Sequence, residues 1–290
     1  MSLTMENMQV GSYRHITVTP WSGSLGAVIG GVDLADLSDD AVAEIRAAWL
    51  QHLVVFFRDQ GHLTNDQYVA FAKRIGQPDR YPFVKGFDDA PEIIPIMKLP
   101  HETVNFGGVW HSDTTYLEQP PMATMLLARE LPPAGGDTMY ANQYAAFEAL
   151  SPRMQELLSG LRGVASSALA DVSKTREDRL KDHGDTPDAG RVYEAVHPVV
   201  RTHPETGRKA LFVNVAHTAR FEGMTDEESK GLLQFLFQHQ VRPEFTCRFR
   251  WEPGSLALWD NRCAQHNPVN DYHGFKRLLH RITLKGDRPA

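Results

Sequence analysis

The residues best suited to chemistry are His111 and Asp113, which stand two positions apart in the aromatic run 110–116. The composition of this run predicts a strand, in which positions i and i+2 point to the same face. One nitrogen ligand and one oxygen ligand would then lie side by side. They would supply two members of a 2-His-1-carboxylate facial triad, the ligand set of non-haem Fe(II) oxygenases.

A third ligand is expected at His266, although most of the 13 histidines must be ordinary core or surface residues. His266 follows the apolar stretch 255–260 and precedes Arg277 and Arg281, which stand four positions apart. Positions i and i+4 of a strand share a face, so both guanidinium groups could point inward. Buried guanidinium groups need anions, and their fork suits a carboxylate or a sulfonate. A metal beside two such arginines favours an acidic co-substrate and is compatible with an acidic substrate.

The elements that must position these residues are mostly short strands joined by glycine and proline turns. Helices are expected after the capping residues Ser38, Thr64, Ser151 and Thr225, and over 142–150. This pattern predicts a mainly β fold, a sandwich or jelly roll with added helices. No repeat or linker divides the chain, so we expect one domain over 1–290. Strands are expected over 16–18, 26–32, 54–57, 122–128, 197–201, 210–215, 245–251, 255–260 and 281–284.

Two stretches fit neither a helix nor a strand pattern. Residues 77–108 are rich in proline, glycine and aspartate and lead directly into the His-x-Asp motif. A long loop inside a domain is often functional, so we interpret 77–108 as a lid or substrate loop, with a solvated connection as the alternative. Residues 165–192 are polar and poorly periodic, which predicts a mobile or ligand-ordered insertion.

Composition narrows the class of protein. The 290 residues carry a net charge of −6, which argues against nucleic acid as a partner. No run of about 18 apolar residues is present, so no membrane span is expected. The two cysteines, Cys247 and Cys263, fit neither a zinc spacing nor a disulfide framework, and we therefore expect a cytoplasmic protein.

Four motifs, taken together, match a known family. They are Trp-His-Ser-Asp at 110–113, Gly-Gly-Asp-Thr at 135–138, Trp-Asp-Asn-Arg at 259–262 with His266, and Arg277 followed by His-Arg at 280–281. From about residue 16 to residue 289, the chain resembles the Fe(II)/2-oxoglutarate-dependent dioxygenases of the taurine dioxygenase and 2,4-dichlorophenoxyacetate dioxygenase (TauD/TfdA) family.

The resemblance implies a double-stranded β-helix in which His111, Asp113 and His266 bind iron. It also implies that Thr138 and Arg277 hold the distal carboxylate of 2-oxoglutarate. The family oxidises this co-substrate with O2 to succinate and CO2 while it hydroxylates a substrate carbon. Hydroxylation next to sulfur or oxygen gives a product that fragments. A homodimer or homotetramer is implied as well.

Two positions depart from taurine dioxygenase itself. Tyr81 stands where that enzyme has a histidine that helps to bind the sulfonate, and Gly107 stands where it has an asparagine. Arg281 remains at the position that contacts the sulfonate. We therefore predict a small anionic substrate other than taurine: a sulfonate, a sulfate ester or an aryloxyalkanoate. Tyr81, Phe106 and His217 are further candidates for the substrate pocket, with core packing as the alternative for the aromatic residues.

Two other classes of function fit the same ligands. A cupin-like zinc or manganese protein could bind or isomerise a small acid without oxygen chemistry. A metal-free binding or structural protein is the third possibility. Thr138 and Arg277 at the family spacing favour the dioxygenase. Anaerobic addition of Fe(II) and 2-oxoglutarate separates these classes, because only the dioxygenase is expected to give a weak visible charge-transfer band.

Overall fold

The computed structural model describes residues 13–81, 84–105, 107–169 and 192–290. Its helices are α1 (Asp39–His52), α2 (Asn65–Ile75), α3 (Gln143–Glu148), α4 (Pro152–Ser159), α6 (Asp226–His239) and the 3-10 helix η2 (Pro243–Phe245). Its strands are β1 (Thr17–Pro20), β2 (Ala27–Gly30), β3 (Val54–Phe57), β4 (Pro78–Asp79), β5 (Ile94–Lys98), β6 (Ala123–Glu130), β7 (Thr138–Asn142), β8 (Arg162–Ser166), β9 (Glu194–Pro198), β10 (Val200–Thr202), β11 (Lys209–Leu211), β12 (Thr218–Phe221), β13 (Thr246–Phe249), β14 (Leu256–Asp260), β15 (Ala264–Pro268) and β16 (Arg277–Leu284).

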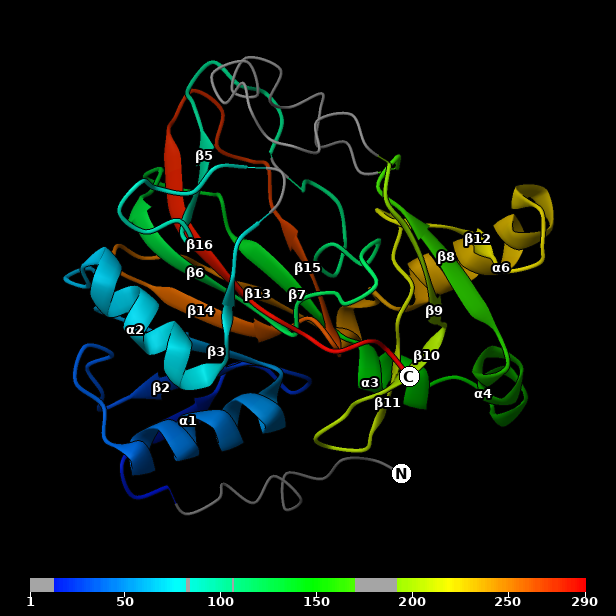
Figure 1. Cartoon of the computed structure of the whole chain (residues 1–290), viewed down its shortest axis with the longest axis horizontal. Helices are drawn as coiled ribbons and strands as arrows, with labels where there is room; N and C mark the ends of the chain where they lie inside the picture. Colours follow the sequence, from blue (N-terminus) through cyan, green and yellow to red (C-terminus); the bar gives the residue numbers. More distant parts are fainter. Residues whose placement is uncertain (1–12, 82–83, 106, 170–191) are drawn as a thin grey trace.

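Two sheets face each other and form the centre of the molecule (Figure 1). The larger has the order β1-β2-β3-β14-β6-β16-β4, with β5 paired to β16, and the smaller has the order β13-β7-β15. Between them, the rings of Phe56 and Phe249 stack with centroids 3.9 Å apart, and Tyr140 packs against Trp259. This arrangement confirms the predicted mainly β, jelly-roll architecture.

Strand β3 is an apolar run that is buried on both faces of the large sheet. Val54 and Phe56 point into the core between the sheets, whereas Val55 and Phe57 point into a second core. Successive side chains of a strand alternate between faces, so a continuous apolar run is buried on both. Helices α1 and α2 cover the outer face of the large sheet with side chains such as Trp49 (Figure 1).

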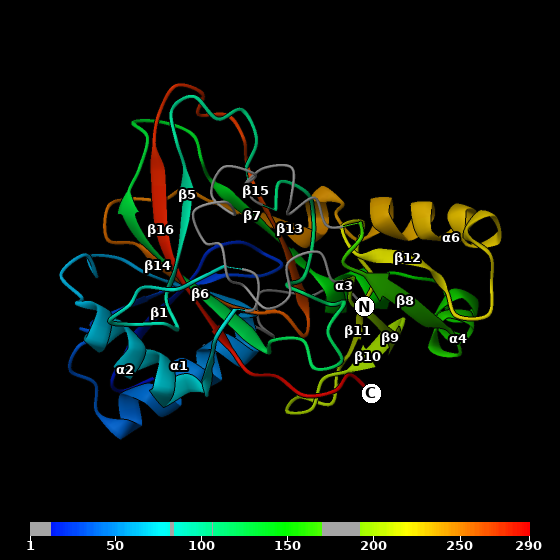
Figure 2. The same ribbon diagram turned by 45° about the horizontal axis from the view of Figure 1, so that its top comes forward.

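A third apolar cluster lies at the end of the molecule away from α1 and α2 (Figure 2). Helices α3, α4 and α6 pack there with the strand sets β12-β8-β9 and β10-β11. Helix α6 begins with the capping box predicted at Thr225, in which the Thr225 hydroxyl accepts from the Glu228 N–H. No helix within the described ranges is long and apolar enough to cross a membrane.

Three local predictions need correction. Residues 111–116 form turns rather than the expected strand; only His111 makes a bridge, to His266, and Thr114 has a φ of +42°. Strand β5 lies inside the stretch 77–108, which was predicted to be irregular. Its Pro95 hides it from sequence patterns, because proline weakens a strand prediction although an edge strand tolerates it. Strand β15 was not expected either, since it is short and polar. Most of the predicted insertion 165–192 lies outside the described residues.

Candidate active site

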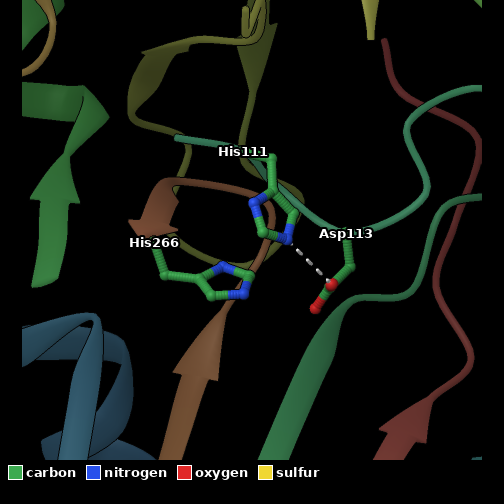
Figure 3. A group of neighbouring side chains, drawn as sticks. All are labelled: His111, Asp113 and His266. Atoms are coloured by element: carbon green, nitrogen blue, oxygen red, sulfur yellow. Dashed lines mark ion pairs between the residues drawn. The ribbon is translucent and has the colours of Figure 1, made fainter. Parts of the chain in front are cut away.

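The main chain brings His111 and His266 together. The N–H of each donates to the carbonyl oxygen of the other, at 3.0 and 2.8 Å. Their rings lie with centroids 4.1 Å apart, and the turn after His111 carries the carboxylate of Asp113 toward both (Figure 3). All three side chains are buried, and one ligand atom from each lies within 4.8 Å of the other two. The structure thus assembles the three predicted ligands without the strand that was expected to align them.

The protonation of the two histidines suits a metal. Nδ1 of His111 donates to the carbonyl oxygen of Val109 at 2.7 Å, which leaves Nε2 as an acceptor 3.7 Å from Oδ1 of Asp113. Burial lowers the pKa of His111, although the charge of Asp113 opposes it. Burial and the neighbouring His111 also lower the pKa of His266 well below its ordinary value. Both rings are therefore neutral near pH 7, the form that binds metals.

Asp113 is held by a chain of hydrogen bonds from two strands. The hydroxyl of Thr124 on β6 donates to Oδ2 of Asp113 at 2.6 Å, and the amide of Asn261 donates to Thr124 Oγ1 at 2.9 Å. The indole N–H of Trp259 donates to Oδ1 of Asn261 at 2.9 Å. This chain leaves Oδ1 of Asp113 facing the histidines. In the sequence, no motif marks Thr124, and only the motif at 259–262 marks Asn261.

A cation also contacts this carboxylate. Nη2 of Arg281 lies 2.9 Å from Oδ1 of Asp113. Burial alone would raise the pKa of Asp113, but the charge of Arg281 and the hydrogen bond from Thr124 outweigh it. The pKa of Asp113 therefore lies below its ordinary value, and Asp113 is ionised. Nε and Nη2 of Arg281 have no hydrogen-bond acceptor in good geometry among the described residues, so the pair is a charge contact that leaves donors available.

One cavity is lined both by the two histidines and by Arg277. Arg277 is buried, and its Nε and Nη2 have no hydrogen-bond partner in the described part of the chain. Thr138 is fixed beside it by the Trp251 indole, which donates to Thr138 Oγ1 at 3.0 Å. An acid group is the natural partner for the free guanidinium edge. The cavity is lined by Ile96, Met97, Lys98, Asn105, His111, Leu126, Thr138, Trp259, His266, Pro268, Tyr272, Arg277 and Arg281.

The predicted Gly-Gly-Asp-Thr turn positions Arg277. Gly136 has a φ of +70°, and a Cβ there would lie 3.1 Å from Cδ and Nε of Arg277. Its N–H donates to Asp271 at 2.7 Å, and Arg248 bridges Asp137 and Asp271 at 2.6 and 3.1 Å. Only glycine has the freedom of backbone and the lack of a side chain that position 136 requires, so Gly136 shapes the pocket while Thr138 of the same motif lines it.

The predicted substrate residues have different locations. The guanidinium carbon of Arg281 lies 5.0 Å from the ring centroid of Tyr81. His217 does not line the cavity; it lies behind the His-x-Asp turn, with Nδ1 3.0 Å from Thr115 Oγ1. Phe106 lies outside the described residues. Roles for Tyr81 and His217 in substrate binding remain predictions.

A second buried group, His203, Asp260 and Cys263, has the spacing of a metal site. Its bonds are already satisfied within the protein. Nε2 of His203 donates to Asp260 at 3.0 Å, Arg262 donates to the same carboxylate at 2.7 Å, and Nδ1 of His203 accepts the N–H groups of residues 205 and 206. The histidine has no free lone pair for a metal, and the group is a structural ion-pair network.

Comparisons with known proteins agree with this geometry. The model of the family "Taurine catabolism dioxygenase TauD, TfdA family" matches residues 16–283. An alpha-ketoglutarate-dependent sulfate ester dioxygenase of Pseudomonas putida is 36% identical over 295 residues, covering 99% of this chain and 96% of its own. An (S)-phenoxypropionate/alpha-ketoglutarate-dioxygenase of Sphingobium herbicidovorans is 31% identical over 289 residues, covering 93% and 95%.

Solved structures give the same result. The crystal structure of a taurine dioxygenase from Burkholderia xenovorans superposes with a TM-score of 0.80 at 40% identity, covering 96% of this chain and 93% of that one. Both the motifs and the fold therefore match along nearly the whole chain, which argues against the non-oxidative and metal-free alternatives. The chain belongs to the TauD, TfdA family and is a 2-oxoglutarate-dependent dioxygenase, as its motifs predict.

Proposed function

We propose that this dioxygenase binds Fe(II) through His111, Asp113 and His266 and oxidises a small organic anion. The observation that carries the proposal is one cavity lined both by His111 and His266, which lie beside Asp113, and by the buried Arg277, whose Nε and Nη2 have no hydrogen-bond partner among the described residues. Two neutral imidazoles and one carboxylate on one side of a metal leave its other positions open. That donor set suits iron in a site that must also take a co-substrate and O2.

The residues at the far end suit 2-oxoglutarate. Its distal carboxylate matches the free Nε and Nη2 of Arg277, with the Thr138 hydroxyl beside them. Its 2-oxo acid end would then face the three ligands. Bound iron supplies the oxidation by O2 that converts 2-oxoglutarate to succinate and CO2 and places one oxygen atom on the substrate. The protein orients both molecules and keeps the ligands in their binding form.

Arg281 is the proposed anchor for the acidic group of the substrate. Its guanidinium retains free donors and lies against the Tyr81 ring, so a sulfate or carboxylate beside an apolar body would fit. The relative from Pseudomonas putida favours a sulfate ester as the substrate. An aryloxyalkanoate or a sulfonate other than taurine is the alternative. Hydroxylation of the carbon bonded to the ester oxygen gives a hemiacetal sulfate. Its C–O bond then breaks, and an aldehyde and hydrogen sulfate leave.

The test is succinate release by the Fe(II)-loaded protein with alkyl sulfates, phenoxypropanoates and taurine, each compared with an uncharged analogue. We expect an alkyl sulfate or phenoxypropanoate to couple to succinate formation and the corresponding alcohol to fail. Coupling to neutral compounds alone would contradict the role of Arg281. Binding of a small acid with no consumption of 2-oxoglutarate would contradict the oxidative function.

A further inference from the structure

Lys98, the last residue of β5, is a buried lysine with no anionic partner within hydrogen-bond distance among the described residues. It is 4% exposed, and its Nζ has no hydrogen-bond partner among the residues that the structure describes. Burial lowers the pKa of Lys98, and the charge of Glu102 only partly offsets this effect. A buried ammonium group is costly unless an anion pairs with it. Its position in the wall of the cavity therefore points to an anionic ligand.

The register of the sheet shows where in the cavity that ligand would lie. Lys98 stands directly opposite Arg277 in the antiparallel β5–β16 pair. Directly opposite residues point to the same face of a sheet, and like charges in such a pair repel. Both also approach one aromatic ring: Nζ of Lys98 lies 4.1 Å, and the guanidinium carbon of Arg277 5.8 Å, from the centroid of Tyr272. An anion between the two cations would relieve the repulsion.

Lys98 also lies at the end of the pocket away from the substrate anchor. In the same register, Arg281 stands opposite Ile94, four residues from Lys98 along β5. Arg281 contacts Asp113 at one end of the β5–β16 strand pair, whereas Lys98 and Arg277 lie at the other end. A ligand that reaches Lys98 is therefore the molecule that binds Arg277.

We propose that Lys98 is a second cation for the distal carboxylate of 2-oxoglutarate, with one carboxylate oxygen on Arg277 and the other on Nζ of Lys98. This inference rests on the proposed function. It assigns Lys98 a role in co-substrate specificity: two cations select a dicarboxylate over a 2-oxo acid that ends in a methyl group. The hydroxyl of Tyr272, which donates to Asn105 at 2.8 Å, keeps the shared ring in place.

The experiment compares wild type with Lys98→Met, which keeps the length of the side chain and removes its charge. Protein loaded with Mn(II) is titrated calorimetrically with 2-oxoglutarate and with 2-oxopentanoate, which has the same chain length but no distal carboxylate. Loss of a charge-assisted hydrogen bond predicts a rise of about tenfold to a hundredfold in Kd for 2-oxoglutarate. The Kd for 2-oxopentanoate should not change.

Lys276→Met is the matched control. Lys276 precedes Arg277, is partly exposed and pairs with Glu130 at 2.6 Å on the surface. Its loss should leave both dissociation constants unchanged. Lys98→Arg, which keeps the charge, should retain most of the affinity for 2-oxoglutarate.

Thermal unfolding separates ligand binding from a structural role. Ligand-free Lys98→Met should have a Tm equal to or above that of wild type, because an unpaired buried charge has been removed. A lower Tm, an unchanged Kd for 2-oxoglutarate, or an equal loss for both 2-oxo acids would each overturn the inference. Lys98→Gln repeats the measurement if Lys98→Met does not fold. Failure of wild type to bind 2-oxoglutarate would instead overturn the proposed function.

Discussion

Nη2 of Arg281 lies 2.9 Å from Oδ1 of Asp113, the carboxylate oxygen that also faces Nε2 of His111. One oxygen thus serves two roles: it is the counter-ion of Arg281 and the donor offered to a metal. A metal bound to Oδ1 would weaken the pull of Asp113 on the guanidinium. The guanidinium would then be freer to bind an acidic substrate. This relationship links occupation of the metal site to recognition of the substrate.

Replacement of Arg281 should therefore act mainly on the substrate. We expect Arg281→Gln to raise KM for the anionic substrate by about tenfold to a hundredfold, because a charge-assisted hydrogen bond is lost. KM for 2-oxoglutarate should change less, since its distal end is assigned to Arg277. Steady-state succinate formation with each compound varied in turn checks this. A larger effect on 2-oxoglutarate than on the substrate would contradict the assignment.

Removal of the Thr124 hydroxyl should weaken metal binding without touching a ligand. Thr124→Val deletes the 2.6 Å hydrogen bond to Oδ2 of Asp113 and leaves a side chain of similar shape. Loss of a bond that orients a ligand typically costs about 10- to 100-fold in metal affinity. Competition with a chelator measures the affinity for Fe(II) or Mn(II). Thr124→Ser keeps the hydroxyl and is expected to bind metal nearly as wild type does. Equal metal affinities for Thr124→Val and Thr124→Ser would refute the role of this hydroxyl in orienting Asp113.

A side chain at Gly107 should disturb His111. A Cβ there would lie 2.9 Å from Cε1 and 3.1 Å from Nε2 of His111, and the φ of Gly107 is +65°. The backbone strain of Gly107→Ala should cost about 1–2 kcal/mol in the free energy of unfolding, and metal affinity should fall as well. Gly108→Ala is the control, because its Cβ would meet only ordinary contacts at 3.5 Å or more. Denaturant unfolding and metal titration of both variants test this, and identical results would count against it.

The metal-free protein should lose stability as the pH falls. Burial lowers the pKa of His217 from 6.5 to about 3. Between these values the unfolded chain takes up a proton that the folded chain does not. Above pH 6.5, His217 does not reduce the free energy of unfolding. Below pH 6.5, it lowers the free energy of unfolding by about 1.4 kcal/mol for each pH unit.

His217→Gln should remove this dependence. Urea unfolding gives the free energy of unfolding at pH 7 and at pH 5. The decrease between these pH values should be about 2 kcal/mol smaller in the variant than in wild type. Thr115, whose Oγ1 lies 3.0 Å from Nδ1 of His217, remains in place to hydrogen-bond the new amide. An unchanged difference between the two pH values would show that His217 is already protonated in the folded protein.

The amino-acid sequence determined the class of protein and predicted most of its candidate polar site. Short motifs hold His111, Asp113 and His266, with Thr138 and Arg277, and their residue types suit the proposed chemistry. A motif can be read without knowing its neighbours. The apolar runs, such as β3, likewise predicted the buried strands. These features are local, so periodicity is enough to predict the buried strands, and resemblance to a known family is enough to identify the motifs.

The tertiary structure decided what the motifs contact. Asp113 is oriented by Thr124 on β6 and by Asn261 in the turn after β14. Lys98 faces Arg277 only through the register of β5 on β16. The His-x-Asp segment is a turn, and a main-chain bridge to a residue far along the chain, rather than strand alternation, aligns its side chains. The pairing of distant strands follows from packing the whole core, which no local pattern of residues specifies.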